Sequence, residues 1–366
     1  PHPPPLFFFK KKTAYDIGVR LVGSERCIRD STAADVNTAY SANTAGTITG
    51  LGNEVVTISD TTLAADVLNT LNGNTTGLVT ATGVTAITGT AAQINTLVGN
   101  EGDSGDKVNL DTDYTATITD TDIAASVLNT LNSNVPGLVT ATSVTNITGT
   151  AAAINTLMGN EGDSGNKINL DTDFTVTVSA GSVDAAHLNT INAKTTSLVT
   201  ATAVTALTGT ASAINTLVGN LGSSGDKVNL AGNFTITVGA GSTSASTLNT
   251  LNAATTGLIT ATAVTNITGT AAALNTLMGN EGDSGDKVNL ADDFTVTVSA
   301  GSVAAAHLNT INSKTTGLVT ATAATTITGT AAAINTLIGN EGDSGDKVNL
   351  DADYDITVNS GTASVS

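Results

Sequence analysis

The tetrapeptide Leu/Ile-Asn-Thr-Leu/Ile occurs ten times in this chain, at alternating spacings of 26 and 34 residues, which gives a period of 60. A half-repeat of about 30 residues is too short to bury an apolar face alone and gains a core only by stacking on its neighbours. The period therefore predicts a solenoid. The copies begin at Leu68, Ile94, Leu128, Ile154, Leu188, Ile214, Leu248, Leu274, Leu308 and Ile334, after a degenerate copy at Val36.

Residues 1–31 do not follow the period, and they hold every Arg and the single Cys of the chain. This stretch resembles the translation of a sequencing-adapter read, so we predict a non-native or disordered tail. We expect the chain to be a segment of a longer protein, because the pattern continues to its last residues. Residues 32–366 are predicted to form a single elongated array, with a partial repeat at 32–77, full repeats at 78–137, 138–197, 198–257 and 258–317, and a partial repeat at 318–366.

One repeat shows how each coil is expected to fold. Residues 138–147 are rich in Val and Thr and predict one or two short strands. Thr150 is a suitable N-cap for a helix over 151–158, which has apolar residues on one face. Residues 174–178 alternate apolar with polar, and 183–191 predict a second helix. The predicted class is an α/β repeat solenoid of stacked coils, built from short parallel β-strands and two-turn helices; a pure parallel β-helix is the alternative.

Two kinds of side chain recur at fixed positions and indicate how the coils stack. An Asn interrupts every predicted helix, so we expect its amide to form a ladder, bonding to other amides or to turn backbone. Aromatic rings recur every 60 residues and are expected to form an internal column, with Tyr40 as an outlier. These rings are Tyr114, Phe174, Phe234, Phe294 and Tyr354.

The charge balance excludes some partners. The chain has 13 Lys and Arg against 31 Asp and Glu, and the tail carries six and three of these, so residues 32–366 have a net charge of −21. Such a charge repels nucleic acid and anionic membranes and attracts divalent cations. No apolar run approaches the ~18 residues of a spanning helix. We therefore expect no nucleic-acid partner and no membrane-spanning segment, and the absence of Cys from the array is compatible with an extracellular setting.

An acidic loop, residues 160–166 in one copy, recurs after alternate helices and is the best candidate for chemistry. Ca²⁺ takes six to eight oxygen ligands, and Gly-rich turns can gather carboxylates around it. The stretch 102–110 also resembles, imperfectly, the calcium-binding nonapeptide of secreted toxin repeats. The third loop has Leu221 and Ser223 where the others are acidic, which argues against an obligatory metal. Ca²⁺ is the only cofactor considered, and its weak candidate ligands are Glu101, Asp103, Asp106, Asp111, Asp113, Glu281, Asp283, Asp286, Glu341, Asp343 and Asp346.

Two further classes receive less support. Thr-x-Thr pairs such as Thr115 and Thr117 resemble the ice-contact ranks of antifreeze solenoids, although Thr also suits the solvent side of a strand. His187 and His307 share one register, but Val67, Val127 and Thr247 occupy it elsewhere, so they look like tolerated substitutions. A polysaccharide-cleaving β-helix is the remaining enzymatic alternative. Nothing in the sequence pairs a nucleophile with a base, and we expect no enzyme.

The segments 35–40, 50–60 and 68–76 resemble the repeats of giant bacterial cell-surface proteins, often from marine bacteria. The resemblance covers residues 32–366 and implies a structural or adhesive role in a large exported protein, as a rod, coat or spacer, located outside the cell or on its surface. It offers no catalytic residues. The implied partners are neighbouring repeats of the same chain and, beyond them, cell-surface polysaccharide or other cells. A calcium-stabilised module and an ice-binding Thr array are the alternatives.

Overall fold

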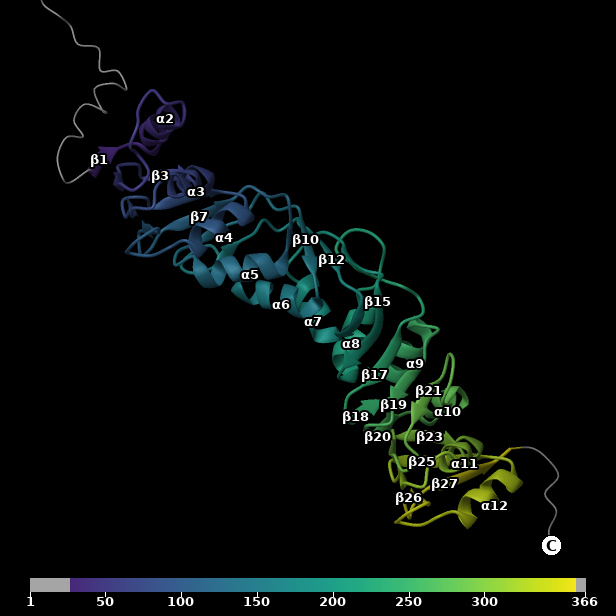
Figure 1. The fold of residues 1–366 in the computed structure, drawn as a ribbon. Coiled ribbons are helices and arrows are strands. Elements are labelled where there is room, and N and C mark those ends of the chain that lie inside the picture. Colours follow the sequence, from purple (N-terminus) through teal and green to yellow (C-terminus); the bar gives the residue numbers. More distant parts are fainter. Residues whose placement is uncertain (1–26, 360–366) are drawn as a thin grey trace, which may run out of the picture. The chain divides into compact units, whose positions relative to one another are not determined.

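A computed structural model describes residues 27–359 (Figure 1). The chain divides into two compact units, an N-terminal unit of Pro1–Ile147 with Thr156–Phe174 and a C-terminal unit of Thr148–Asn155 with Thr175–Ser366. Most of the predicted tail, residues 1–26, lies outside the described residues. Its last five residues form β1 (Cys27–Ser31), which pairs in parallel with β2 (Val55–Ile58).

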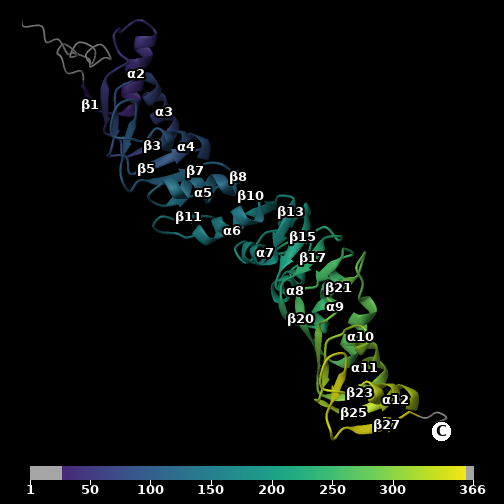
Figure 2. The same cartoon turned by 60° about the horizontal axis from the view of Figure 1, so that its bottom comes forward.

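Each half-repeat contributes one short helix. The helix that ends the 26-residue half begins after a Thr N-cap. At α8, for example, the Thr210 hydroxyl accepts a hydrogen bond from the N–H of Ala213 at 3.1 Å, which pairs one N–H that the first helical turn leaves free. Successive helices of each unit pack side by side (Figures 1 and 2). None of the helices described within residues 27–359 has the length and apolar character to cross a bilayer. The helices are α2 (Ala33–Thr44), α3 (Ala65–Asn74), α4 (Ala91–Gly99), α5 (Ala125–Asn134), α6 (Ala151–Asn160), α7 (Ala185–Asn192), α8 (Ala211–Gly219), α9 (Ala245–Ala254), α10 (Ala271–Asn280), α11 (Ala305–Asn312) and α12 (Ala331–Gly339).

The 26-residue half forms a short coil with two strands. Its second strand ends at the residue before the Thr N-cap of the following helix. The strands of the short coils are β4 (Val79–Ala81) and β5 (Ala86–Gly89), β9 (Val139–Thr140) and β10 (Asn146–Gly149), β14 (Val199–Ala201) and β15 (Val204–Gly209), β19 (Ile259–Ala261) and β20 (Val264–Gly269), and β24 (Val319–Ala321) and β25 (Ala324–Gly329).

The 34-residue half forms a long coil with three strands. The third strand was not predicted: residues 181–184, which include the start of the expected helix 183–191, form β13, and α7 begins only at Ala185. The eight extra residues thus supply a strand as well as a loop. The strands of the long coils, complete and partial, are β2 and β3 (Thr62–Ala64), β6 (Val108–Leu110), β7 (Thr115–Ile118) and β8 (Asp122–Ala124), β11 (Ile168–Asn169), β12 (Thr175–Val178) and β13 (Gly181–Asp184), β16 (Val228–Leu230), β17 (Thr235–Val238) and β18 (Gly241–Ser244), β21 (Val288–Leu290), β22 (Thr295–Val298) and β23 (Gly301–Ala304), and β26 (Val348–Leu350) and β27 (Asp355–Val358).

Strands of successive coils pair in parallel, but each sheet shifts sideways as it crosses the coils. In the C-terminal unit one sheet has the order β13-β15-β17-β19-β21. It therefore starts at the third strand of a long coil and ends at the first strand of a later long coil. The order β3-β5-β7-β9-β11 repeats this arrangement in the N-terminal unit. The α/β solenoid of stacked coils is confirmed, and the pure β-helix alternative is wrong because each half-repeat carries a helix.

The core consists of apolar columns that run from coil to coil. Leu207, Ile236, Ile259 and Val288 are register partners on successive strands, and each is at most 1% exposed. Burial of one such side chain contributes roughly 1.5–3 kcal/mol. Because the strand alternates, the neighbouring register carries an outer polar column of Thr208, Thr237, Thr260 and Asn289. A coil therefore completes its interior only with the coils on either side.

The predicted aromatic column is internal. Tyr114, Phe174, Phe234 and Phe294 are each at most 1% exposed, whereas Tyr354 is half-buried. In the first long coil Glu54 takes the place of the ring, and the outlier Tyr40 reaches it from α2. The Tyr40 hydroxyl donates to Glu54 Oε2 at 3.2 Å, and the same oxygen accepts from the Gly52 N–H at 2.7 Å.

The repeated Asn side chains connect neighbouring helices by hydrogen bonds. The Nδ2 of Asn69 donates to the carbonyl of Gln93 at 2.8 Å, and that of Asn249 donates to the carbonyl of Ala273 at 2.9 Å. Each acceptor lies in the next helix, so these amides bond to helix backbone rather than to turn backbone as predicted. One amide–amide bond joins Asn74 Nδ2 to Asn37 Oδ1 at 3.4 Å, but Asn74 lies outside the Leu/Ile-Asn-Thr register and is not part of the predicted ladder. The hydrogen bonds of Asn69 and Asn249 join α3 to α4 and α9 to α10.

Candidate functional site

Backbone hydrogen bonds close the acidic loop against the first strand of each long coil. In the first loop the N–H of Val108 donates to the carbonyl of Asn100 at 2.9 Å, and the N–H of Gly102 donates to the carbonyl of Val108 at 3.1 Å. The other edge of β6 pairs with β4. The loop thus covers a sheet edge that would otherwise expose unpaired N–H and C=O groups.

The same closure occurs in all five loops, at the bridges Glu101↔Val108, Glu161↔Ile168, Leu221↔Val228, Glu281↔Val288 and Glu341↔Val348. The third loop has Leu221 in place of Glu and still forms its bridge. Closure is therefore a property of the backbone and does not require the acidic side chain.

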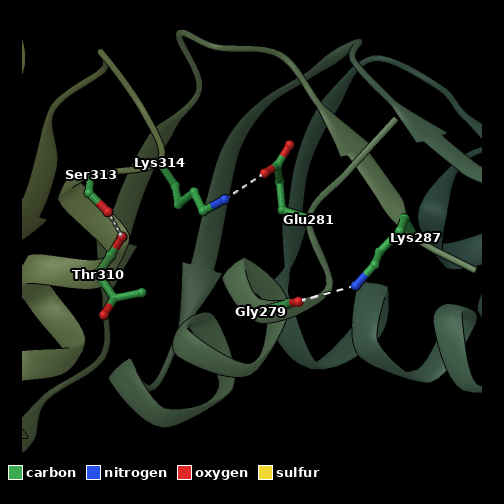
Figure 3. Close-up of polar contacts among 6 residues, drawn as sticks. All are labelled: Gly279, Glu281, Lys287, Thr310, Ser313 and Lys314. Atoms are coloured by element: carbon green, nitrogen blue, oxygen red, sulfur yellow. Dashed lines mark hydrogen bonds and ion pairs between the residues drawn. The ribbon is translucent and has the colours of Figure 1, made fainter. Parts of the chain in front are cut away.

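A Lys holds several of these loops to the end of the preceding helix. Lys107 Nζ donates to the carbonyl of Gly99 at 3.4 Å, and Lys287 Nζ donates to the carbonyl of Gly279 at 3.4 Å (Figure 3). A cation is favoured there because the C-terminal end of a helix carries unpaired carbonyls and a partial negative charge. The Lys thus holds the loop against the helix end, and its charge also offsets part of the negative charge of the loop.

Most candidate carboxylates lie along these loops, whereas Asp111 and Asp113 lie in the turn between β6 and β7. Most are exposed and the rest half-buried. Some are engaged within the chain. Asp111 Oδ1 accepts from the N–H of Asp113 at 3.1 Å. Glu281 forms an ion pair with Lys314 at 3.0 Å (Figure 3), and Asp346 Oδ1 accepts from Asn312 Nδ2 at 3.3 Å.

The pKa shifts of these carboxyls have local causes. Burial raises the pKa of Glu101. The hydrogen bond with the Asp113 side chain lowers the pKa of Asp111, and the same bond raises the pKa of Asp113. Asp113 is therefore the member of the pair that takes up a proton first as the pH falls. The two pKa values move in opposite directions because the two adjacent carboxyls share one proton.

The candidate ligands do not converge on one point. Within residues 27–359 no group of three or more His, Cys, Asp and Glu side chains is placed to hold a metal ion. Asp103, Asp106, Asp283, Asp286 and Asp343 are all exposed on their loops. Calcium binding by the loops stays a prediction.

The Thr pairs form narrow columns. Thr117 pairs with Thr88 on one side and Thr140 on the other, whereas Thr115 pairs with Ala86. Of the two Thr residues in this pair, Thr117 thus has Thr on both neighbouring strands, whereas Thr115 faces Ala86. The stacked strands therefore carry one column of Thr here and not two. Ice binding also stays a prediction.

Sequence reasoning missed two Asp side chains that cap helices of other coils. Asp60 Oδ2 accepts a hydrogen bond from the N–H of Ala33 at 2.8 Å, and Asp120 Oδ2 accepts from the N–H of Ala91 at 2.7 Å. Each acceptor faces the first residue of a helix, α2 or α4. A usable signal was present: this register holds Asp60 and Asp120 but then Ala180, Ala240 and Ala300.

Of the two aligned histidines, His187 lies on α7 beside a shallow groove of ≈ 210 Å³, together with Asp184 and Thr150. The Asp184 carboxylate is held by the N–H of Ala186 at 2.8 Å. This carboxylate is thus used as a helix cap, and no catalytic arrangement is assigned to the histidine. The absence of enzymatic activity stays a prediction.

Comparisons with protein-family models, with curated proteins and with solved structures found no match to this chain.

Proposed function

We infer that residues 32–366 serve as a structural segment of a large exported bacterial cell-surface protein, as a rod, coat or spacer. The observation that carries this inference is the continuous coil-to-coil interior, in which columns such as Leu207, Ile236, Ile259 and Val288 cross four coils. A stack of this kind can grow by adding repeats without changing its cross-section. Length is what a rod or spacer needs.

The treatment of the sheet edges supports the same function. Exposed edge strands of a repetitive β protein invite pairing with other chains. Here backbone bridges from the acidic loops cover one edge, and the net charge of −21 on residues 32–366 keeps chains apart. Adhesion to polysaccharide or to other cells would belong to the acidic face or to other parts of the protein.

Two experiments test this function. Small-angle scattering of residues 32–366 should give a radius of gyration well above the ~20 Å expected for a compact domain of this length. An antibody against residues 198–257 should label intact cells that produce the protein. A compact particle would exclude the rod, and labelling only after the cells are opened would exclude the surface location.

A further inference from the structure

The caps formed by Asp60 and Asp120 identify a position where this fold accepts a carboxylate. The first N–H groups of a helix have no partner in the helix, and the N-terminus carries a partial positive charge. The distances of 2.8 Å from Ala33 N to Asp60 Oδ2 and 2.7 Å from Ala91 N to Asp120 Oδ2 are those of strong hydrogen bonds to a charged acceptor. The chain itself therefore shows which chemical group this position binds.

Later repeats keep one backbone hydrogen bond at this position and lose the carboxylate. The N–H of Thr119, just before Asp120, donates to the carbonyl of Gly89 at 3.1 Å; in the C-terminal unit the N–H of Gly239, just before Ala240, donates to the carbonyl of Gly209 at 2.7 Å. The same strand end thus reaches the same helix start. Ala240 is too short to reach the helix.

Grooves lie at two of the positions where the carboxylate is lost. One of ≈ 350 Å³ lies at the start of α8, and its lining includes Thr210, Ala211, Ser212, Ala240, Ser242 and Thr243. The groove beside His187, already described, lies 60 residues earlier at the start of α6, where its lining includes Ala151 and Ala180. Both belong to the C-terminal unit. Each groove lies at a position where Ala replaces the capping Asp, and Ala300 is the third such position.

The groove at α8 is suited to a carboxylate. Its lining holds no acidic side chain, while Ser212, Ser242 and Thr243 contribute hydroxyls. The Thr210 hydroxyl is occupied by the N–H of Ala213, so it does not replace Asp120 on the N–H of Ala211. The groove at α6 is less favourable because it contains Asp184, although the N–H of Ala186 engages that carboxylate.

We propose that the grooves at the starts of α8 and α6 bind the carboxylate group of an external organic acid, such as a sugar acid, in the place that Asp120 fills at α4. The acid oxygens accept hydrogen bonds from the first N–H groups of the helix, and the hydroxyls of the groove bind the rest of the molecule. This site is independent of the acidic loops, which lie at the opposite end of the helices.

The test compares galacturonate with neutral galactose by saturation-transfer NMR on the full chain. Galacturonate should give the stronger signal. A variant that restores the Asp of the first repeats at all three Ala positions, A180D/A240D/A300D, should lose at least nine-tenths of it. The Gly after each Ala is kept, because Gly241 has a φ of 133°, which a side chain rarely adopts.

A matched control separates groove filling from added charge. The variant N166D/S223D/N233D adds the same three negative charges at exposed loop positions where other repeats carry Asp, and it should retain most of the galacturonate signal. Equal signals for the two sugars, or an undiminished signal in the filled variant, would overturn the proposal. A signal lost equally in both variants would assign the binding to net charge and also overturn it.

A second variant tests the site without filling any groove. D120A removes the carboxylate at α4, so the melting temperature should fall, and high acetate should restore more of it than acetate adds to the unaltered chain. Acetamide, which is neutral, should not. If acetate shifts both proteins equally, the helix start does not accept an external carboxylate and the proposal fails.

Discussion

At the residue scale, the first long coil replaces an aromatic ring with a pair of polar side chains. Tyr40 is 3% exposed and Glu54 is 2% exposed, and the hydrogen bond between them joins α2 to the segment before β2. Burial raises the pKa of Tyr40 to about 12, the Thr75 hydrogen bond opposes this, and the charge of Glu54 raises the pKa further. The folded state therefore holds this proton more tightly than the unfolded chain does.

This pKa gives a pH dependence with a defined sign. An unfolded Tyr titrates near pH 10, so the contribution of Tyr40 to stability is complete below about pH 10 and is lost as the pH rises towards about 12. Urea unfolding at intervals across this range should show a steeper loss of stability for the unaltered chain than for Tyr40→Phe. Because the other titrating groups are unchanged in the variant, identical slopes would contradict the assignment.

A second residue-scale prediction concerns the ring column. The Tyr114 hydroxyl is buried without a hydrogen-bond partner, and Phe174, Phe234 and Phe294 hold the same register. An unpaired buried hydroxyl costs ~1–3 kcal/mol. Tyr114→Phe should therefore raise the free energy of unfolding by about 1 kcal/mol, and the reverse change Phe234→Tyr should lower it. Denaturant titration measures both. A destabilised Y114F would mean that the hydroxyl has a partner.

At the scale of elements, the loop that follows α10 depends on its backbone. Gly285 has a φ of 69°, and its carbonyl accepts from the N–H of Lys287 at 2.9 Å. A side chain in this conformation costs roughly 1–2 kcal/mol, although an added Cβ would meet no atom within 4 Å. Gly285→Ala should therefore speed hydrogen exchange of the Gly282 N–H, which bonds to Val288.

Gly279→Ala is the matched control for this loop. Gly279 lies in α10, and an added Cβ there also meets no atom within 4 Å. Ala is favoured over Gly in a helix by up to about 1 kcal/mol. The control should leave exchange at Gly282 unchanged or slow it. Equal acceleration in both variants would show that loop closure does not depend on the conformation of Gly285.

The carboxylates of the same loop are expected to matter less than its backbone. The double change E281L/D283S gives the loop the residues of the third loop, which forms its bridge at Leu221. It also removes the exposed ion pair with Lys314, worth at most about 1 kcal/mol. The melting temperature should change little, with or without millimolar Ca²⁺. A Ca²⁺-dependent rise in the unaltered chain that the variant loses would favour the calcium-stabilised alternative.

At the scale of the whole molecule, the period predicts the solenoid, the apolar columns and the ring column, because each is a property of residue type at fixed spacing. The third strand of the long coil was missed because Gly181–Asp184 runs directly into α7 and its apolar Val183 also fits a helix face. The sideways shift of the sheets was missed as well. The shift depends on whether β17 pairs with β19 or with β20 of the next coil, and these two strands have similar Ile, Val and Thr content.

The candidate site divides in the same way. Composition identified the acidic loops, but their edge-covering role lies in backbone bonds that also form at Leu221 and leave no mark in the pattern of charges. The capping Asp120 and its replacement Ala240 were visible in the repeat alignment. Their meaning was not, because it depends on the contact between residue 120 and the start of a helix 29 residues earlier.

The shared interior leads to a prediction about length. Excised residues 198–257 would lose the pairing of β14 with β12, of β15 with β13, of β17 with β19 and of β18 with β20. Each of its two coils would then keep a neighbour on one side only, so this fragment should not show cooperative unfolding by circular dichroism. The longer fragment 198–317 recovers the pairs with β19 and β20, and its unfolding free energy should rise because each added interface contributes a nearest-neighbour term. Cooperative folding of the 60-residue fragment, with no gain from the longer one, would mean that each repeat has its own core.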